Sequence, residues 1–189
     1  WALVTDVVDG RLCASLAEQT ELSIIGVSAD AGNIAAARER LAKRGLYGRR
    51  VSVHLADGGA LPFTDYFANL IVSESAWLGR GSSRLAKGER ERLLQPHNGV
   101  AWLEPDAAPY RASGLAGAGE WTHQYGNPAN TCNSGDSIVH SDLVLQWFGG
   151  PGAAPMVDRH LRAPAPLATE GKLIIPGENL AIAVDAYNG

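Results

Sequence analysis

The sequence predicts an α/β fold built on parallel strands, followed by a shorter β-rich region. Its 189 residues are 46% hydrophobic and 19% charged, which suits a globular chain with one good core or two small ones. Between Leu22 and Ser73 the spacing of apolar residues changes from that of a strand to that of a helix and back. From Pro105 onward the helical spacing does not return, and turn residues separate short apolar runs.

The clearest elements lie in the first half of the chain. Leu22–Val27 is an apolar run of strand length, and the helical spacing that follows predicts a helix over 31–44. Asp30 stands where an N-cap acceptor would satisfy the first free amides of that helix. Val51–Leu55 and Leu70–Val72 predict two further buried strands. Strands separated by a helix of this length predict a parallel, right-handed crossover.

The flanking segments extend the same alternation. Ala2–Thr5 predicts a buried strand, and Leu12 and Leu16 share one face of a helix that follows it. Residues 82–95 predict a charge-rich, weakly amphipathic helix, and 100–103 predicts a fifth buried strand. The first half therefore predicts five strands with intervening helices.

A set of motifs lies along the first half: Gly26-Val27, the helix Ile34–Leu41, Asp57, Leu61-Pro62-Phe63 and Phe67–Ile71. Together they resemble the core of class I S-adenosylmethionine (SAM) dependent methyltransferases. The resemblance covers about residues 2–103, and it implies a Rossmann-like parallel sheet in the order 3-2-1-4-5 that binds SAM. The last two strands of that family have no counterpart here, so we expect a truncated sheet.

The resemblance places the cofactor loop directly after the first strand. The three glycines of the family's loop fall on Asp6, Val8 and Gly10, and only the last is a glycine. Glycines there let the backbone approach the ligand, whereas a valine side chain fills that space and disfavours positive φ. We therefore expect weakened SAM binding.

Two more positions carry over from the resemblance. The acid that accepts hydrogen bonds from the ribose falls on Ser28, which offers one hydroxyl and no charge. Asp30 either substitutes for that acid or serves only as the N-cap. Asp57 matches the residue that contacts the adenine amino group, and the alternative is a solvated acid in a turn.

No catalytic residue is identified by the sequence. Ser73-Glu74-Ser75 stands where amino-methylating relatives carry an Asn/Asp-Pro-Pro-aromatic motif, and the absence of that motif removes support for methylation of a base or amide nitrogen. Glu74 is either a general base or a solvated acid at a strand end. The formal net charge of -4 disfavours nucleic acid as a partner.

The second half resembles the opening of a different architecture. Residues 105–120 predict a Pro/Gly/Ala linker, so we expect domains at 1–104 and 121–189. Leu180–Asp185 and Asn188-Gly189, together with Trp121–Tyr125, resemble a pyrroloquinoline-quinone (PQQ) type β-propeller repeat. One partial blade cannot bury its own faces, so the remaining blades or another protein surface are expected partners.

Cysteines and histidines offer no clear ligand set. Cys13 and Cys132 lie far apart, and we expect a buried thiol and a loop thiol, with a disulfide as the alternative. His123, His140 and His160 share no ligand-like spacing, so no metal site is expected. No apolar run reaches membrane-spanning length.

These observations predict a methyltransferase-like domain with an eroded cofactor loop, joined to the start of a propeller and weak or inactive in methyl transfer. The small-molecule cofactor would be SAM, bound weakly, and nothing in the sequence identifies a PQQ or calcium site. One alternative is a non-catalytic binding or scaffold module of a larger exported protein, and another is a fragment of a PQQ-dependent oxidoreductase. A methyltransferase implies a cytoplasmic location, and a propeller implies a periplasmic or otherwise exported one.

Overall fold

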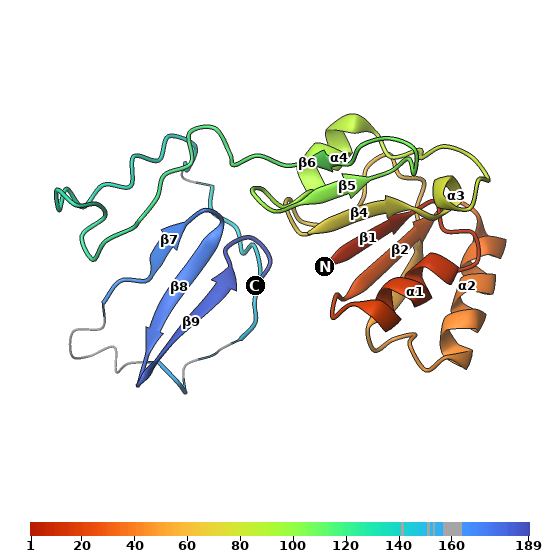
Figure 1. Ribbon diagram of the computed structural model, residues 1–189, viewed down its shortest axis with the longest axis horizontal. Coiled ribbons are helices and arrows are strands. Elements are labelled where there is room, and N and C mark those ends of the chain that lie inside the picture. Colours follow the sequence, from red (N-terminus) through yellow and green to blue (C-terminus); the bar gives the residue numbers. More distant parts are fainter. Residues whose placement is uncertain (141, 151, 153, 157–163) are drawn as a thin grey trace. The chain divides into compact units, whose positions relative to one another are not determined.

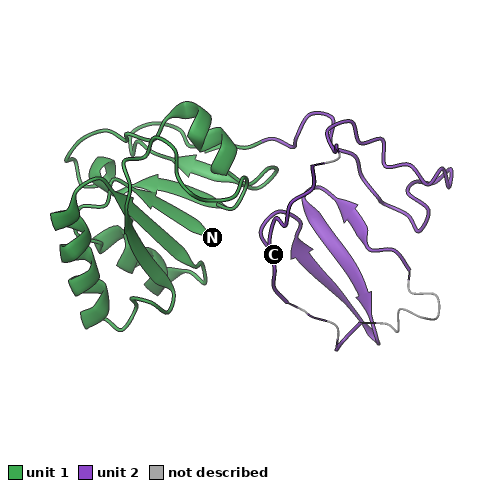
Figure 2. Cartoon of the chain, turned by 180° about the vertical axis from the view of Figure 1, so that it is seen from behind, with its two compact units in different colours: residues 1–112 green, residues 113–189 purple. Residues whose placement is uncertain are grey.

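The computed structural model describes residues 1–189 except 141, 151, 153 and 157–163, so the predicted loop residue His160 lies outside the described residues. The chain forms two compact units, residues 1–112 and 113–189 (Figure 2). The boundary falls inside the segment 105–120 that the sequence predicts as a linker. The first unit continues past residue 104 because a short strand, Tyr110–Arg111, joins its sheet.

The first unit is built on a six-stranded sheet in the order β3-β2-β1-β4-β5-β6 (Figure 1). Its first five strands are parallel, which confirms the predicted order 3-2-1-4-5. The sixth strand pairs antiparallel with β5 and is an addition to the predicted sheet. The strands are β1 (Ala2–Thr5), β2 (Ile24–Ser28), β3 (Val51–Leu55), β4 (Leu70–Ser73), β5 (Val100–Trp102) and β6 (Tyr110–Arg111).

Helices α1 (Arg11–Gln19) and α2 (Ala31–Lys43) connect the first three strands. Asp30 caps α2 as predicted, because its Oδ1 accepts a hydrogen bond of 2.9 Å from the backbone amide of Asn33. Gly45, with a φ of +68°, follows the end of this helix. Local capping signals in the sequence thus define α2.

The charge-rich helix is shorter than the sequence predicts. After the one-turn helix α3 (Glu74–Trp77), helix α4 covers Lys87–Leu93 instead of 82–95. The backbone amide of Arg84 donates to the Asp6 carboxylate at 3.2 Å, outside any helical ladder. This long-range contact holds residues before Ala86 out of the helix, and Ala86 itself is extended.

Alternating side chains of the central strands fill two cores, one on each face of the sheet. Ala2 and Val4 of β1 pack with helices α1 and α2, whereas Leu3 points to the opposite face. That second face is covered by α4 and the turn around the Leu-Pro-Phe element. Fully buried members include Ala37, Leu41 and Val53 on the first face and Ile71, Leu93 and Ala68 on the second.

The second unit is β-rich, as predicted, but its sheet is small. β7 (Leu167–Thr169), β8 (Lys172–Gly177) and β9 (Leu180–Asp185) form an antiparallel sheet in sequence order. Trp121 bridges Ala168 of β7 through two backbone hydrogen bonds of 2.8 and 2.9 Å. Among the described residues of this unit only Gly126 is buried. A propeller is not formed by this one sheet, and the PQQ-repeat resemblance stays a prediction.

The two thiols lie in the environments that the sequence predicts. Cys13 is buried, Cys132 is exposed and both are free. Burial, reinforced by the nearby Glu74 carboxylate, raises the pKa of the Cys13 thiol far above its usual value, so this cysteine is a packing residue rather than a nucleophile.

Within the described ranges, no helix has the length and apolar character that crossing a membrane requires. In the same part of the chain, histidine, cysteine and acidic side chains form no group of three or more that would hold a metal ion.

Candidate functional site

The topology points to the carboxyl ends of β1 and β4 as a ligand site. The chain runs from β1 to β2 and β3 on one side, and then crosses to β4 on the other side of β1. Open α/β sheets bind ligands in the crevice at such a switch point. A cavity of about 370 Å³ lies there, and the residues that line it include Asp6, Val7, Val8, Ser75, Arg80 and Arg84.

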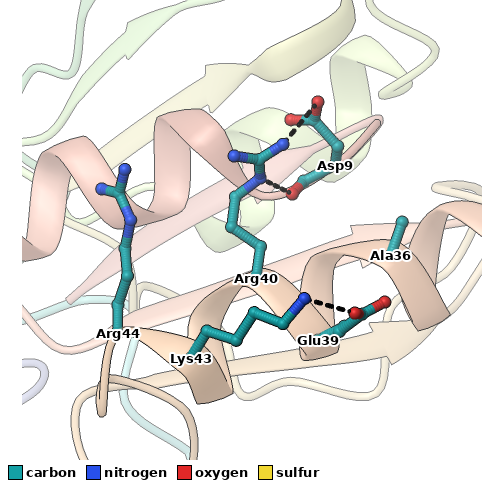
Figure 3. Close-up of a pocket in the computed structure, with 6 residues that line it drawn as sticks. All are labelled: Asp9, Ala36, Glu39, Arg40, Lys43 and Arg44. Atoms are coloured by element: carbon teal, nitrogen blue, oxygen red, sulfur yellow. Dashed lines mark hydrogen bonds and ion pairs between the residues drawn. The ribbon is translucent and has the colours of Figure 1, made fainter.

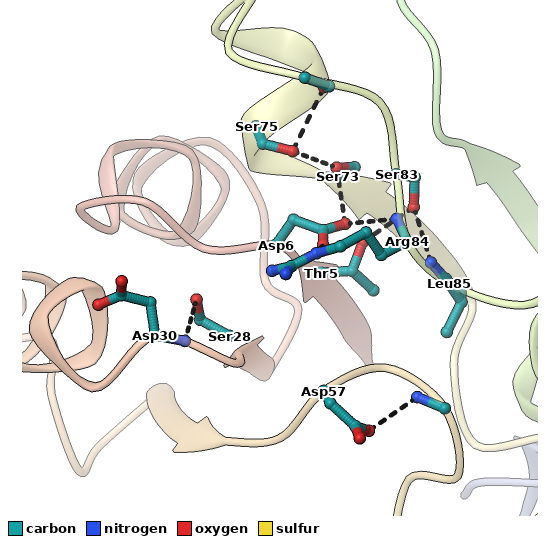
Figure 4. Close-up of polar contacts among 12 residues, drawn as sticks. Thr5, Asp6, Ser28, Asp30, Asp57, Ser73, Ser75, Ser83, Arg84 and Leu85 are labelled. Carbon is teal, nitrogen blue, oxygen red and sulfur yellow. Dashed lines mark hydrogen bonds and ion pairs between the residues drawn. The ribbon is translucent and has the colours of Figure 1, made fainter.

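Asp6 and Arg84 join the two segments that meet at the switch point. Nε of Arg84 donates to Oδ1 of Asp6 at 2.8 Å, and the hydroxyl of Ser73 donates to Oδ2 at 3.1 Å (Figure 4). The Asp6 side chain is only 7% exposed, whereas that of Arg84 is 57% exposed. Asp6 also has a φ of +50°, a left-handed conformation at the first predicted glycine position. The ion pair therefore ties residues 82–86 to the loop after β1.

The pKa of Asp6 predicts how the stability of the fold depends on pH in the acid range. Burial by itself raises this pKa, but hydrogen bonds from Arg84, Thr5 and Ser73 outweigh it and hold the pKa below the ordinary value of 3.8. A carboxyl group with a lowered pKa stabilises the fold above pH 3.8, and that stabilisation is lost as the pH falls through the lowered pKa. We expect wild type to exceed Asp6→Asn in free energy of unfolding near neutral pH, with the difference vanishing in strong acid.

Urea unfolding of both proteins across this pH range measures the effect. Asparagine tolerates the left-handed backbone, so the substitution removes mainly the charge. A difference that stays constant down to the lowest pH would show that the Asp6 carboxylate does not carry it.

Glu74 lies buried beneath the loop that follows β1. Its Oε2 accepts hydrogen bonds from the backbone amides of Val8, Asp9 and Gly10 at 2.6, 3.2 and 3.1 Å. Its Oε1 accepts a fourth from the amide of Leu12 at 2.8 Å. The residue is 0% exposed and lies at the amino-terminal end of α1.

The surroundings of Glu74 contradict both roles that the sequence suggested, a general base and a solvated acid. It is neither a solvated acid nor a general base with access to a substrate, because all four contacts are structural and no part of it reaches solvent. The carboxylate of Glu74, the first residue of α3, accepts from the backbone amides that the loop presents. The loop is thus held in place from within the chain.

Gly10 has a packing role that the structure makes explicit. Its φ is +76°, and a Cβ added there would lie 3.0 Å from Cβ and 3.2 Å from Cα of Ala37. Gly10 thus allows α1 to begin close against α2. The neighbouring Val8 is half-buried and lines the cavity, so its side chain occupies space at the second predicted glycine position.

The two remaining predicted cofactor positions have partners of their own. The Ser28 hydroxyl accepts a hydrogen bond of 3.3 Å from the amide of Asp30, whose carboxylate caps α2 (Figure 4). Asp57 is exposed, and its Oδ1 accepts from the amide of Gly59 at 3.0 Å. Neither Ser28 nor Asp57 is among the residues that line the cavity. Of the five predicted positions, only Asp6 and Val8 line the cavity, whereas the amide of Gly10 is bonded to the buried Glu74.

A second hollow, of about 380 Å³, lies beside α2 and is lined by basic side chains. Each has an acidic partner: Arg40 contacts Asp9 at 3.3 Å and Lys43 contacts Glu39 at 2.6 Å (Figure 3). Arg44 contacts Glu18 at 2.8 Å. Exposed or partly exposed pairs of this kind neutralise each other and have little charge left for a ligand.

Two residues organise the site: the sequence singled out Glu74 but not its structural role, and it did not single out Arg84. Glu74 directly follows a buried strand in a position that would point toward the first loop, which was a usable signal. Arg84 carried no signal, because its partner Asp6 is 78 residues away in the sequence.

Comparisons with known proteins give structural neighbours only. No protein-family model matches the chain, and a search of curated proteins finds no match. Among solved structures, the chain is similar to a proposed SAM-dependent methyltransferase from Methanococcus maripaludis, with 24% identity, 53% of this chain and 45% of the other covered, and a TM-score of 0.47.

Two further neighbours illustrate different activities. One is geranyl diphosphate C-methyltransferase from Streptomyces coelicolor A3(2), with 12% identity, 53% and 36% covered, and a TM-score of 0.45. The other is the [4+2]-cyclase SpnF, with 20% identity, 53% and 36% covered, and a TM-score of 0.42. The chain spans less than half the length of each structure. We draw no activity for this chain from these likenesses.

Proposed function

We propose that residues 1–112 form a methyltransferase-type domain that binds SAM weakly or not at all and serves as a non-catalytic module. The observation that carries this proposal is that side chains of the chain itself already bind the polar groups of the predicted cofactor loop. Glu74 accepts hydrogen bonds from four backbone amides of the loop and the start of α1, and Arg84 donates one to Asp6 beside the cavity. The groups that would approach a cofactor are engaged with one another.

The other cofactor positions support the same proposal. Val8 places a branched side chain at the cavity, and Ser28 offers a single hydroxyl that already accepts from Asp30. Loss of a charge-assisted ribose contact forfeits on the order of 2 kcal/mol, and the intruding side chain adds a comparable amount. Together they weaken binding about a thousandfold, from micromolar to millimolar.

Titration calorimetry with S-adenosylhomocysteine tests this proposal. We expect a dissociation constant of about 1 mM or weaker, or no measurable heat. A low-micromolar constant would overturn the proposal and favour an active methyltransferase. As a companion variant, Val8→Gly with Ser28→Asp should tighten binding at least about tenfold. If a folded double variant gains nothing, the remodelled cavity around Arg84 is the limiting defect.

For residues 113–189 we propose a partial propeller blade that needs further blades or another protein surface. Three antiparallel strands, β7, β8 and β9, together with the antiparallel bridge from Trp121 to β7, support this proposal, because propeller blades are four-stranded. The near absence of buried side chains among its described residues supports the need for a partner. Amides of Leu180–Val184 should exchange with solvent faster than those of Val51–Leu55. Equal protection in the isolated chain would contradict the proposal.

A further inference from the structure

We propose that the cavity between the loop after β1 and the segment around Arg80 and Arg84 binds a compact anion carrying a phosphate or carboxylate group. The proposal rests on the cavity's own geometry, so it stands whether or not SAM binds. The two arginines are the recognition groups. Both lie within residues 78–86, the segment that links α3 to α4.

The guanidinium of Arg84 is bonded to Asp6 through Nε, which leaves its two terminal nitrogens for a ligand. Its Nε donates to Asp6 at 2.8 Å, and its backbone amide donates to the same carboxylate at 3.2 Å. Across the described ranges, its two terminal nitrogens have no hydrogen-bond partner. A guanidinium fixed in this way is oriented before a ligand arrives, and its remaining N–H groups match the paired oxygens of a carboxylate or phosphate.

Arg80 lies on a tight turn beside the same cavity. Its backbone amide donates to the carbonyl of Ser75 at 2.8 Å, and Gly79 and Gly81 on either side have φ values of +64° and +141°. In the part of the chain that the structure describes, the Arg80 side chain has neither an ion pair nor a hydrogen bond. Its charge is therefore available at the cavity.

The balance of charge favours an anion over a zwitterion or a cation. Among the described residues, Asp6 is the only acid that lines the cavity, and its carboxylate is already paired with one arginine. Glu74, the nearest buried acid along the chain, is satisfied by backbone amides. One positive charge remains uncompensated among the lining residues. The volume of about 370 Å³ is at the lower end of ligand pockets, which indicates a compact ligand.

The alternative is that both arginines are simply solvated surface charges. A matched control variant distinguishes that alternative from an anion site. Arg49 is exposed and lies beside a different hollow, at the amino-terminal end of β3. Arg49→Gln changes the net charge as Arg80→Gln does, but it does so away from the cavity. Arg84→Lys keeps the charge and removes the forked donors.

The test is a titration of the full 189-residue chain with inorganic phosphate and, separately, with malonate, at ionic strength fixed with sodium chloride. Backbone amide resonances of Gly81 and Ser82 report binding. We expect saturation with at least one anion, and about tenfold weaker binding in Arg80→Gln and in Arg84→Lys but not in Arg49→Gln. The anion that saturates identifies the preferred group.

Several results would overturn the proposal. They are shifts that never saturate, shifts that sodium chloride alone reproduces, and equal weakening in Arg49→Gln. Circular dichroism confirms that each variant is folded. If Arg84→Lys fails to fold, Arg80→Gln decides the matter alone, because that side chain has no partner within the described residues to lose.

Discussion

Replacing Glu74 with alanine should lower the free energy of unfolding of the first unit by about 3–5 kcal/mol. The substitution leaves the amides of Val8, Asp9, Gly10 and Leu12 buried or half-buried without their acceptor. It also leaves a cavity where a side chain with 0% exposure was packed. A loss of this size is a large fraction of the 5–15 kcal/mol that typically stabilises a domain.

Two further variants separate the charge from the acceptor geometry. In Glu74→Gln, the amide oxygen can replace Oε2, which accepts three of the four hydrogen bonds, so we expect a loss of about 1–3 kcal/mol. Glu91→Ala removes an exposed acid of α4 and should change stability by no more than about 0.5 kcal/mol.

Urea unfolding followed by helical circular dichroism is the appropriate measurement, because all described helices lie in residues 1–112. If Glu74→Ala proved as stable as Glu91→Ala, the amide cradle would not be a source of stability. The internal occupation of the loop would then lose its energetic basis.

Replacing Gly10 with alanine should cost about 2–4 kcal/mol. Part of this cost is conformational, since φ is +76°, and part is steric, since the new Cβ would lie 3.2 Å from Cα of Ala37. The backbone of α2 cannot move aside as a flexible side chain can. Helices α1 and α2 would have to separate, which disturbs the core around Ala37 and Leu41.

Gly45→Ala is the matched control for Gly10→Ala. Gly45 has a φ of +68°, and nothing lies within 4 Å of the Cβ position. It should therefore carry the conformational cost alone, about 1–2 kcal/mol. Equal losses in the two variants, measured by the same urea unfolding, would show that contact with Ala37 contributes nothing and that Gly10 is free to serve a ligand instead.

The sequence by itself determined the order of elements in the first unit. Periodicity in Val51–Leu55 and Leu70–Val72, and the helical spacing between Asp30 and Gly45, depend on residues close together in the chain. Such local signals place strands and helices because backbone preference and capping act over a few residues. The order in which the strands pair was implied by the resemblance to methyltransferases, and the observed sheet confirms that order.

Only the tertiary structure decided what the residues at the carboxyl ends of the strands do. Glu74 accepts from amides 62 to 66 positions earlier, and Arg84 pairs with Asp6 across 78 positions. Whether Gly10 serves a ligand or a helix contact depends on Ala37, which approaches it only in the folded chain. Local spacing carries no information about such contacts, because the fold creates them when parallel strands bring distant loops to one edge of the sheet.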